Sequence, residues 1–186
     1  DEGHRLFFTG LKYYYKKDIN NTIELYNKAV NLGNSYAMNN LALCYKKGHG
    51  VEKDINRAIS LYKQAVILGN SYAMNSLALC YENGEGVEKN ILKAIELYEK
   101  AIKLDNNNNN IHENLQSLIK KYPSEYIIYL QSKYTNLENE HTQLKNEHQT
   151  LKAEYQEIKY NLINYAPDTI IVKKLENEFY HNANRI

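Results

Sequence analysis

The sequence predicts an all-α protein: a short solenoid of stacked helix pairs followed by a long coiled-coil helix. The main observation is an internal repeat. The segment Tyr26–Ile55 returns 36 residues later as Tyr62–Ile91, with 22 of 30 aligned positions identical. A partial third copy, YEKAIKLD, begins at Tyr98. Self-similarity at this period is typical of stacked repeat proteins, which build extended surfaces that hold other molecules. A seven-residue spacing of apolar residues after position 124 predicts the coiled coil.

The first half of the repeated unit has the pattern of an amphipathic helix. Its apolar residues are spaced three and four apart, which is the helical period; in the second copy they are Ile55, Ala58, Ile59, Leu61, Tyr62, Ala65, Val66 and Leu68. Asp18, Asp54 and Asn90 precede the three copies, where a short side-chain oxygen caps free backbone N–H groups. Gly33 and Gly69 follow and suit a left-handed C-cap.

The second half of the unit, NSYAMNNLALCYKKG, predicts another helix between an Asn-Ser cap and Gly48 or Gly84. Ala37, Leu41 and Tyr45 lie at i, i+4 and i+8 and predict its buried stripe. A Gly-His-Gly-Val or Gly-Glu-Gly-Val turn then leads to the next unit. These turns lack the preceding strand and the further Gly or Lys of phosphate-binding loops. The run Asn106–Asn110 predicts a loose loop between the last repeat helices.

The pattern A-x3-L-[GA]-x2-Y-x2-G-x-G-V-x2-[DN]-x3-A-x3-Y-x2-A resembles the Sel1-like repeat, a relative of the tetratricopeptide repeat. One copy runs through Ala37, Leu41, Ala42, Tyr45, Gly48, Gly50, Val51, Asp54, Ala58, Tyr62 and Ala65. The next runs through Ala73, Leu77, Ala78, Tyr81, Gly84, Gly86, Val87, Asn90, Ala94, Tyr98 and Ala101. Ala42 and Ala78 stand where the family usually has Gly, and Gly10 takes that place in a shortened N-terminal copy. The resemblance covers residues 5–122 and implies a right-handed α-solenoid of antiparallel helix pairs that binds proteins.

A heptad repeat predicts a coiled-coil helix over residues 124–166, between the array at 1–122 and a short C-terminal helix or tail at 168–186. Ser124 is its expected N-cap, and Pro167 its expected stop. The expected self-association residues occupy the a and d positions: Ile127, Leu130, Tyr134, Leu137, His141, Leu144, His148, Leu151, Tyr155, Ile158 and Leu162. A helix of this length exceeds what so short an array can cover, so its apolar stripe predicts a partner helix.

Charge patterning predicts that this helix forms a parallel homodimer. With Tyr134 at position a, the g→e pairs are all opposite in sign: Lys133–Glu138, Glu140–Lys145, Glu147–Lys152 and Glu154–Lys159. In a parallel dimer these pairs form between chains. An antiparallel dimer would pair g with g and set Glu mostly against Glu. His141 and His148 would each face their own copy in the seam. A parallel trimer stays open as an alternative.

Composition excludes several classes of protein. The formal net charge of +1 gives no electrostatic case for nucleic acid or an anionic membrane. No apolar run approaches the length of a membrane span. Cys44 and Cys80 occupy the same position in successive repeats, are expected to be buried, and favour the reducing cytoplasm. The six histidines include no His-Glu-x-x-His, and no catalytic, cofactor-binding or metal-ligating set stands out. The sequence therefore predicts a protein that is not an enzyme and needs no cofactor.

Two hypotheses of function remain. The first is an interaction scaffold, in which the array binds a protein or peptide partner and the coiled coil gives self-association. The second is a structural oligomerisation protein, in which the coiled coil is the functional element and the repeats only cap it. Positions that differ between otherwise matching repeats are the candidate partner-binding residues: Asn27, Lys28, Asn31, Lys63, Gln64, Ile67, Glu99, Lys100 and Lys103. A solvated face that binds nothing is the alternative interpretation of these positions.

Overall fold

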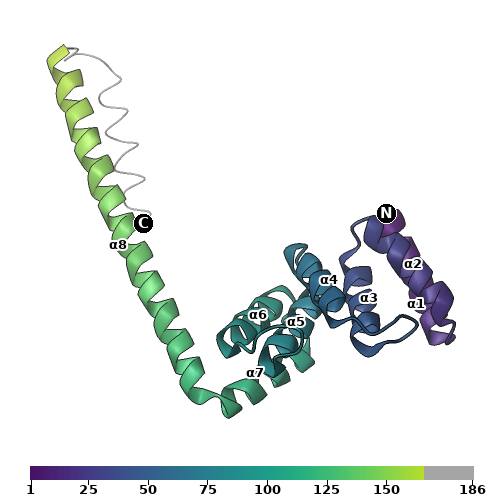
Figure 1. Cartoon of the computed structure of the whole chain (residues 1–186). Helices are drawn as coiled ribbons and strands as arrows, with labels where there is room; N and C mark the ends of the chain where they lie inside the picture. The colour runs from purple at the N-terminus through teal and green to yellow at the C-terminus, as the bar shows by residue number, and fades with distance from the viewer. Residues whose placement is uncertain (166–186) are drawn as a thin grey trace. The chain divides into compact units, whose positions relative to one another are not determined.

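The computed structural model describes the backbone of residues 1–165 and the side chains of residues 1–161, and within these residues it is all helical (Figure 1). The helices are α1 (Glu2–Tyr15), α2 (Ile19–Asn31), α3 (Ser35–Lys47), α4 (Ile55–Ile67), α5 (Ser71–Asn83), α6 (Ile91–Leu104), α7 (Asn109–Lys121) and α8 (Pro123–Tyr165). Residues 1–130 form one compact unit, and a second begins at Gln131. The prediction of an all-α fold is confirmed for residues 1–165.

Helices α1 to α6 pack as three pairs. The most extensive contacts join α1 to α2, α3 to α4 and α5 to α6, whereas contacts between successive pairs are smaller. Short connections between consecutive helices make the neighbours antiparallel. The three connections within pairs therefore lie at one end of the stack, and the connections between pairs lie at the other. The Gly-x-Gly-Val turns join α3 to α4 and α5 to α6, so they lie within pairs, whereas the sequence interpretation places them between units.

Side-chain caps begin the second helix of each pair, as the sequence predicts. Asp18, Asp54 and Asn90 accept hydrogen bonds through Oδ1 from the backbone N–H three residues later, at 3.2, 2.9 and 2.9 Å. Such a cap satisfies one of the four N–H groups that have no partner inside a helix. The boundaries of α2, α4 and α6 therefore follow from single polar residues.

The connections between pairs use a glycine followed by an asparagine. Gly33 and Gly69 have φ of +77° and +76°. The next residues, Asn34 and Asn70, donate their backbone N–H to the carbonyls of Ala29 and Ala65, both at 3.0 Å. The same asparagines then cap α3 and α5 by accepting from Ala37 N and Ala73 N, at 2.8 and 2.9 Å. One residue thus completes a Schellman C-cap and begins the next helix, which fixes the angle of the turn.

The turns within pairs explain the two glycines of the motif. Gly48 and Gly84 end α3 and α5 in the left-handed conformation, with φ of +72° and +70°. Gly86 is constrained by packing as well: a Cβ there would lie 2.5 Å from Cγ1 of Ile55 and 3.1 Å from Cγ1 of Ile59. These isoleucines belong to the preceding pair, so the second glycine sets how closely neighbouring pairs approach.

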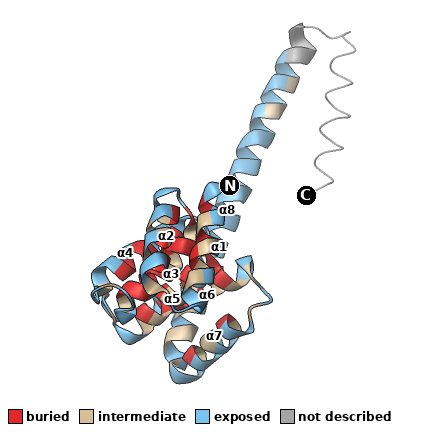
Figure 2. Cartoon of the chain, turned by 90° about the vertical axis from the view of Figure 1, so that its right-hand side faces the viewer, coloured by how far each residue is buried: buried red, intermediate tan, exposed pale blue. Residues whose placement is uncertain are grey.

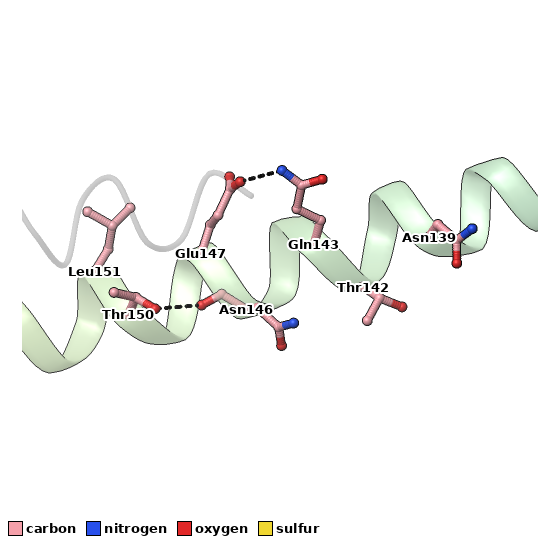
Figure 3. Close-up of a pocket in the computed structure, with 7 residues that line it drawn as sticks. All are labelled: Asn139, Thr142, Gln143, Asn146, Glu147, Thr150 and Leu151. Carbon is pink, nitrogen blue, oxygen red and sulfur yellow. Dashed lines mark hydrogen bonds between the residues drawn. The ribbon is translucent and has the colours of Figure 1, made fainter.

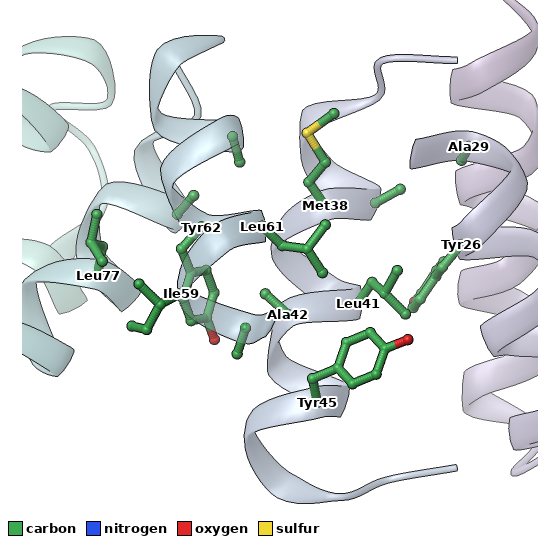
Figure 4. Packing of buried hydrophobic residues seen from close by; sticks show 14 of the residues in the cluster. Tyr26, Ala29, Met38, Leu41, Ala42, Tyr45, Ile59, Leu61, Tyr62 and Leu77 are labelled. Carbon is green, nitrogen blue, oxygen red and sulfur yellow. The ribbon is translucent and has the colours of Figure 1, made fainter. Parts of the chain in front are cut away.

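The core runs between the helices of the array. Buried residues are concentrated in α1 to α7, whereas α8 is largely exposed along its length (Figure 2). Figure 4 shows Leu41, Tyr62 and Leu77 among the residues that fill the space between successive helices. The predicted stripe Ala37, Leu41 and Tyr45 is buried, which confirms that face of α3.

Two expected boundaries are wrong. Helix α8 begins at Pro123, so Ser124 lies in its first turn instead of capping it, and its Oγ donates to Glu125 Oε2 at 3.0 Å. Proline suits the first helical position because its φ is already helical and its missing N–H needs no partner. Helix α7 begins at Asn109, so the last two asparagines of the run Asn106–Asn110 are helical. The expected stop at Pro167 and the final helix within 168–186 lie outside the described residues.

The inner stripe yields a stability prediction. Replacing Leu41 with Ala, or Leu77 with Ala, should lower the free energy of unfolding by about 2–5 kcal/mol, because each change leaves a cavity in a close-packed core. Leu41 is 1% exposed and Leu77 is 3% exposed. Chemical unfolding of the full chain measures the loss. Ile67→Ala is the matched control, since Ile67 is 83% exposed and should change stability by less than about 0.5 kcal/mol. A loss that small at Leu41 would place the stripe on the wrong face.

Candidate protein-binding surface

The first helices of neighbouring pairs lie side by side and form a continuous surface. Helices α3 and α5 contact each other directly, and hydrogen bonds link α3 to α5 and α5 to α7. We call this surface the first-helix face. Its exposed and half-buried side chains are Tyr36, Asn39, Leu43, Tyr72, Asn75, Leu79 and Asn114.

Aromatic rings cross the first-helix face at one end of the helices. The Tyr36 ring lies 6.2 Å from the His4 ring, 5.8 Å from the Phe7 ring and 6.3 Å from the Tyr72 ring, measured between centroids. Tyr36 is 44% exposed and Tyr72 is 48% exposed. Tyrosine combines a large apolar area with a polar tip, which is the reason it is enriched in protein interfaces. This row therefore offers contact area to a partner.

Polar bonds tie neighbouring first helices together beside that row. Ser76 Oγ donates to Asn39 Oδ1 at 3.3 Å, and Asn114 Nδ2 donates to Asn75 Oδ1 at 2.9 Å. Asn70 Nδ2 donates to Ser35 Oγ at 3.2 Å. Half-buried amides that bond to each other hold the helices in register and leave their remaining donors and acceptors for a ligand. Sequence reasoning missed the role of these residues: Asn39 and Asn75 recur at the 36-residue period, but the period does not show which side chain each amide bonds.

Ion pairs cross the same helices at their C-terminal ends. Lys46 Nζ lies 2.7 Å from Glu85 Oε2 and 3.8 Å from Cys80 Sγ, and the Lys46 side chain is only 21% exposed. Lys121 Nζ lies 3.5 Å from Glu82 Oε1. Partial burial strengthens such pairs relative to surface pairs, because water screens them less. The pairs cover the core between α3 and α5 and between α5 and α7.

The candidate partner-binding residues from the sequence lie elsewhere, on α2, α4 and α6. These are the second helices of their pairs, whereas the sequence interpretation treats them as first helices, because periodicity alone does not show where a pair begins. Ile67 and Lys63 are exposed. Lys28 and Lys100 form i, i+4 ion pairs with glutamates of their own helices, each at 2.6 Å. The remaining members are Asn27, Asn31, Gln64, Glu99 and Lys103, and the structure does not gather these nine residues into one pocket.

Some positions that vary between repeats pack against other helices. The Arg57 guanidinium lies 4.5 Å from the centre of the Tyr45 ring, and Lys93 Nζ lies 5.3 Å from that of Tyr81. Glu99 Oε2 accepts a hydrogen bond from the Tyr129 hydroxyl on α8, at 3.0 Å. Variation between repeats therefore does not by itself mark a position as free to meet a ligand.

A surface hollow along α8 is shown in Figure 3. The described residues that line it all belong to that helix: Asn139, Thr142, Gln143, Asn146, Glu147, Thr150 and Leu151. Gln143 Nε2 donates to Glu147 Oε1 at 2.9 Å, and Thr150 Oγ1 donates to the Asn146 carbonyl at 3.1 Å. In a ligand site, polar groups from several elements converge on one point. The polar groups of this hollow come from a single helix and do not converge. The hollow gives no reason to assign a ligand.

A metal site needs a cluster of ligating side chains, and a membrane span needs a long apolar helix. Within residues 1–161, no group of three or more His, Cys, Asp or Glu side chains could hold a metal ion. Along the same residues, no helix combines the length and apolar character needed to cross a bilayer. Both cysteines are buried free thiols, and burial raises their pKa above the usual value, against a smaller opposing effect of nearby lysines.

Comparison with known families identifies the fold. The family model of the Sel1 repeat matches residues 3–34, 35–70 and 71–106, which is more than half of the chain. The chain belongs to the Sel1 repeat family. The three matched repeats coincide with the pairs α1/α2, α3/α4 and α5/α6, so a Sel1 repeat here begins with a helix of the first-helix face. Proteins of this repeat class typically mediate protein interactions.

Solved structures resemble the array. A Sel1 repeat protein from Oxalobacter formigenes is 32% identical over 53% of this chain and 39% of its own length, with a TM-score of 0.50. The protein c5321, a protective antigen of uropathogenic Escherichia coli, is 25% identical over 54% of this chain and 22% of its own, with a TM-score of 0.52. This chain thus spans less than half the length of either relative. No curated protein matches it.

The buried thiols lead to a second prediction. Cys44 and Cys80 should react with a disulfide reagent at about pH 8 more than about tenfold more slowly in the folded protein than in denaturant, because burial hinders access and disfavours the thiolate. Absorbance of the released chromophore measures both rates. Two thiols should react per chain once the protein is unfolded. Fast reaction of both thiols in the native protein would show that the repeat cores open readily.

Proposed function

We propose that this Sel1 repeat protein is a non-enzymatic interaction scaffold. Its array binds a protein or peptide partner through the first-helix face, and α8 pairs with a second copy as a parallel coiled coil. The observation that carries the proposal is the apolar heptad stripe of α8. Seven of its residues are between 45% and 65% exposed: Ile127, Leu130, Tyr134, Leu137, Leu144, Leu151 and Ile158.

Such a stripe favours association because exposed apolar area is costly in water. Burying apolar surface contributes about 25 cal/mol per Å², and large contiguous apolar surfaces usually mark interaction sites. The opposite charges of the g and e positions favour the parallel arrangement, since an antiparallel pair would set g residues against g residues, and three of the four g residues are Glu. Each exposed pair contributes only about 0.2–1 kcal/mol, so the charges select orientation more than they add affinity.

The first-helix face supports the binding half of the proposal. It presents the exposed rings of Tyr36 and Tyr72 beside half-buried amides of Asn39 and Asn75. Aromatic anchors surrounded by polar groups are typical of protein interfaces. The variable residues of α2, α4 and α6 remain a second candidate surface. Two buried free thiols favour a reducing compartment such as the cytoplasm.

A pull-down that compares the full chain with a chain ending at Leu130 tests the proposal. The cut retains Tyr126 and Tyr129, which pack on the core formed by α5, α6 and α7, and leaves the compact unit 1–130 intact. We expect both proteins to capture the same partner, with more captured by the full chain because two linked arrays bind with avidity.

The opposite outcome distinguishes the alternative. If the full chain captures a partner and residues 1–130 capture none, while circular dichroism shows that both are folded, the coiled coil is the functional element and the repeats only cap it.

Self-association has its own test. Sedimentation equilibrium at about pH 7.5 should show a dimer at micromolar concentration, and Leu144→Asp should make it monomeric, because a charge at position d is buried in the seam. Asn146→Asp is the matched control: it adds the same charge at position f, which faces away from the partner. A monomer of the unmodified chain at this concentration, or an equal loss of the dimer in both variants, contradicts the coiled-coil dimer.

A further inference from the structure

A small hollow opens between α1 and α3 at the C-terminal ends of these helices. Its volume is about 190 Å³, and its lining includes the rings of Tyr14, Tyr15 and Tyr26 together with Leu43, Cys44 and His49. Tyr26 and Cys44 are buried and form its floor, whereas Tyr14, Tyr15 and Leu43 are exposed and form its rim. It is a different place from the Tyr36–Tyr72 row.

The repeat provides an internal comparison for this hollow. One repeat later, between α3 and α5, the equivalents of Tyr26, Cys44 and His49 are Tyr62, Cys80 and Glu85. There Lys46 reaches in: its Nζ lies 2.7 Å from Glu85 Oε2 and 3.8 Å from Cys80 Sγ. The protein therefore fills the equivalent space with its own ion pair.

The hollow persists at the first step because both members of that ion pair are replaced. With Gly10 aligned to Ala42, Tyr14 stands where α3 has Lys46, and His49 stands where the next turn has Glu85. Neither replacement can form the pair. Tyr26, Leu43 and Cys44 have identical equivalents at the next step, Tyr62, Leu79 and Cys80, whereas Tyr15 and Asn40 correspond to Lys47 and Ser76. Of these differences, the ion pair is the one whose lysine reaches the buried thiol, so its loss leaves the space beside Cys44 unfilled.

The chemistry of the lining favours an apolar guest. Tyrosine rings, Leu11 and Leu43 form most of it, and no carboxylate or ammonium belongs to it. Asn40 already donates through Nδ2 to the Tyr26 hydroxyl, at 3.3 Å. Burial raises the pKa of the Cys44 thiol, which keeps the floor uncharged. A cavity of about 150 Å³ is large enough for a benzene ring, so this hollow fits one Phe or Leu side chain.

The surroundings of the hollow are basic. Lys12, Lys16 and Lys17 lie next to Tyr14 and Tyr15 in the sequence, and all three are exposed. Lys47 is exposed beside the end of α3. Three acids lie within three residues of the lining. The carboxylate of Asp18 is bonded to Asn21 N and Nδ2, at 3.2 and 2.7 Å, Glu24 is paired with Lys28 Nζ at 2.6 Å, and Glu52 is exposed. The four lysines outnumber these acids. Charge complementarity therefore favours acidic residues on either side of the apolar guest.

We propose that the hollow between α1 and α3 is an anchor pocket for one Phe or Leu side chain of an acidic peptide segment in a partner protein. The proposal rests on the proposed function, because it names where and by what chemistry the array holds its partner. Selectivity comes from two sources: the hydrophobic anchor enters the pocket, and the flanking carboxylates meet the lysines at its rim.

The repeat supplies a matched pair of variants. Tyr14→Lys with His49→Glu should close the pocket by installing the ion pair that α3 and α5 already use, at nearly unchanged net charge. Lys46→Tyr with Glu85→His makes the reverse exchange at the next step and leaves the first pocket intact. The probe is a fluorescein-labelled peptide with one central Phe between runs of Glu, titrated with the full chain and followed by fluorescence anisotropy.

We expect the closing variant to bind this peptide about tenfold or more weakly than the unmodified chain, and the reverse variant to bind at least as well. Peptides with Phe→Gly, or with Lys in place of Glu, should lose affinity by a similar factor. In methyl NMR of the full chain, the Leu43 signals should shift on peptide addition and those of Leu79 should not. This measurement stands even if the closing variant fails to fold.

Three outcomes overturn the proposal: no saturable binding of the peptide by the unmodified chain, equal binding by a folded closing variant, or NMR shifts that leave Leu43 unaffected. The pull-down distinguishes a wrong pocket proposal from a wrong scaffold proposal. If the closing variant captures the same partner as the unmodified chain in the pull-down, the pocket is wrong and the scaffold stands. If neither the full chain nor residues 1–130 capture a partner, the proposed function fails.

Discussion

Close packing of a buried tyrosine against a small residue on the facing helix is the contact on which the array depends. A Cβ at Gly10 would lie 2.9 Å from two carbon atoms of the Tyr26 ring, so α1 and α2 approach as closely as they do only because that side chain is missing. Tyr62 and Tyr98 recur at 36-residue spacing, are fully buried, and share core clusters with Ala42 and Ala78 respectively. Because protein interiors are packed to crystal-like density, a larger residue at these positions would separate the pair.

The period of the repeat follows from that contact and from two kinds of glycine-dependent connection, one between pairs and one within a pair. The Gly33–Asn34 and Gly69–Asn70 junctions set the turn between pairs, and Gly86 lets the connection within a pair approach Ile55 of the preceding pair. Each junction needs a backbone conformation that other residues adopt only with strain. Stacking is therefore specified locally, one pair against the next, as in other repeat proteins.

The sequence predicted the helices of the array well because each boundary depends on one residue with a strong local preference. Asp54 and Gly48 act as expected whatever surrounds them. The start of α8 was harder to predict, since Ser124 and Pro123 both suit a helix N-terminus and the difference is a single residue. Contacts between helices were not predictable: periodicity identifies a buried face but not which neighbour covers it, so the packing of Arg57 on Tyr45 appears only in three dimensions.

The two halves of the proposed function support each other energetically. Burying one Leu or Phe side chain contributes about 1.5–3 kcal/mol, and each 1.4 kcal/mol is about tenfold in affinity. A single anchor pocket of this kind therefore holds a partner only weakly, although rim lysines add selectivity and speed of association. Pairing two arrays through α8 makes the second contact intramolecular, which raises the overall affinity without any new contact in either array.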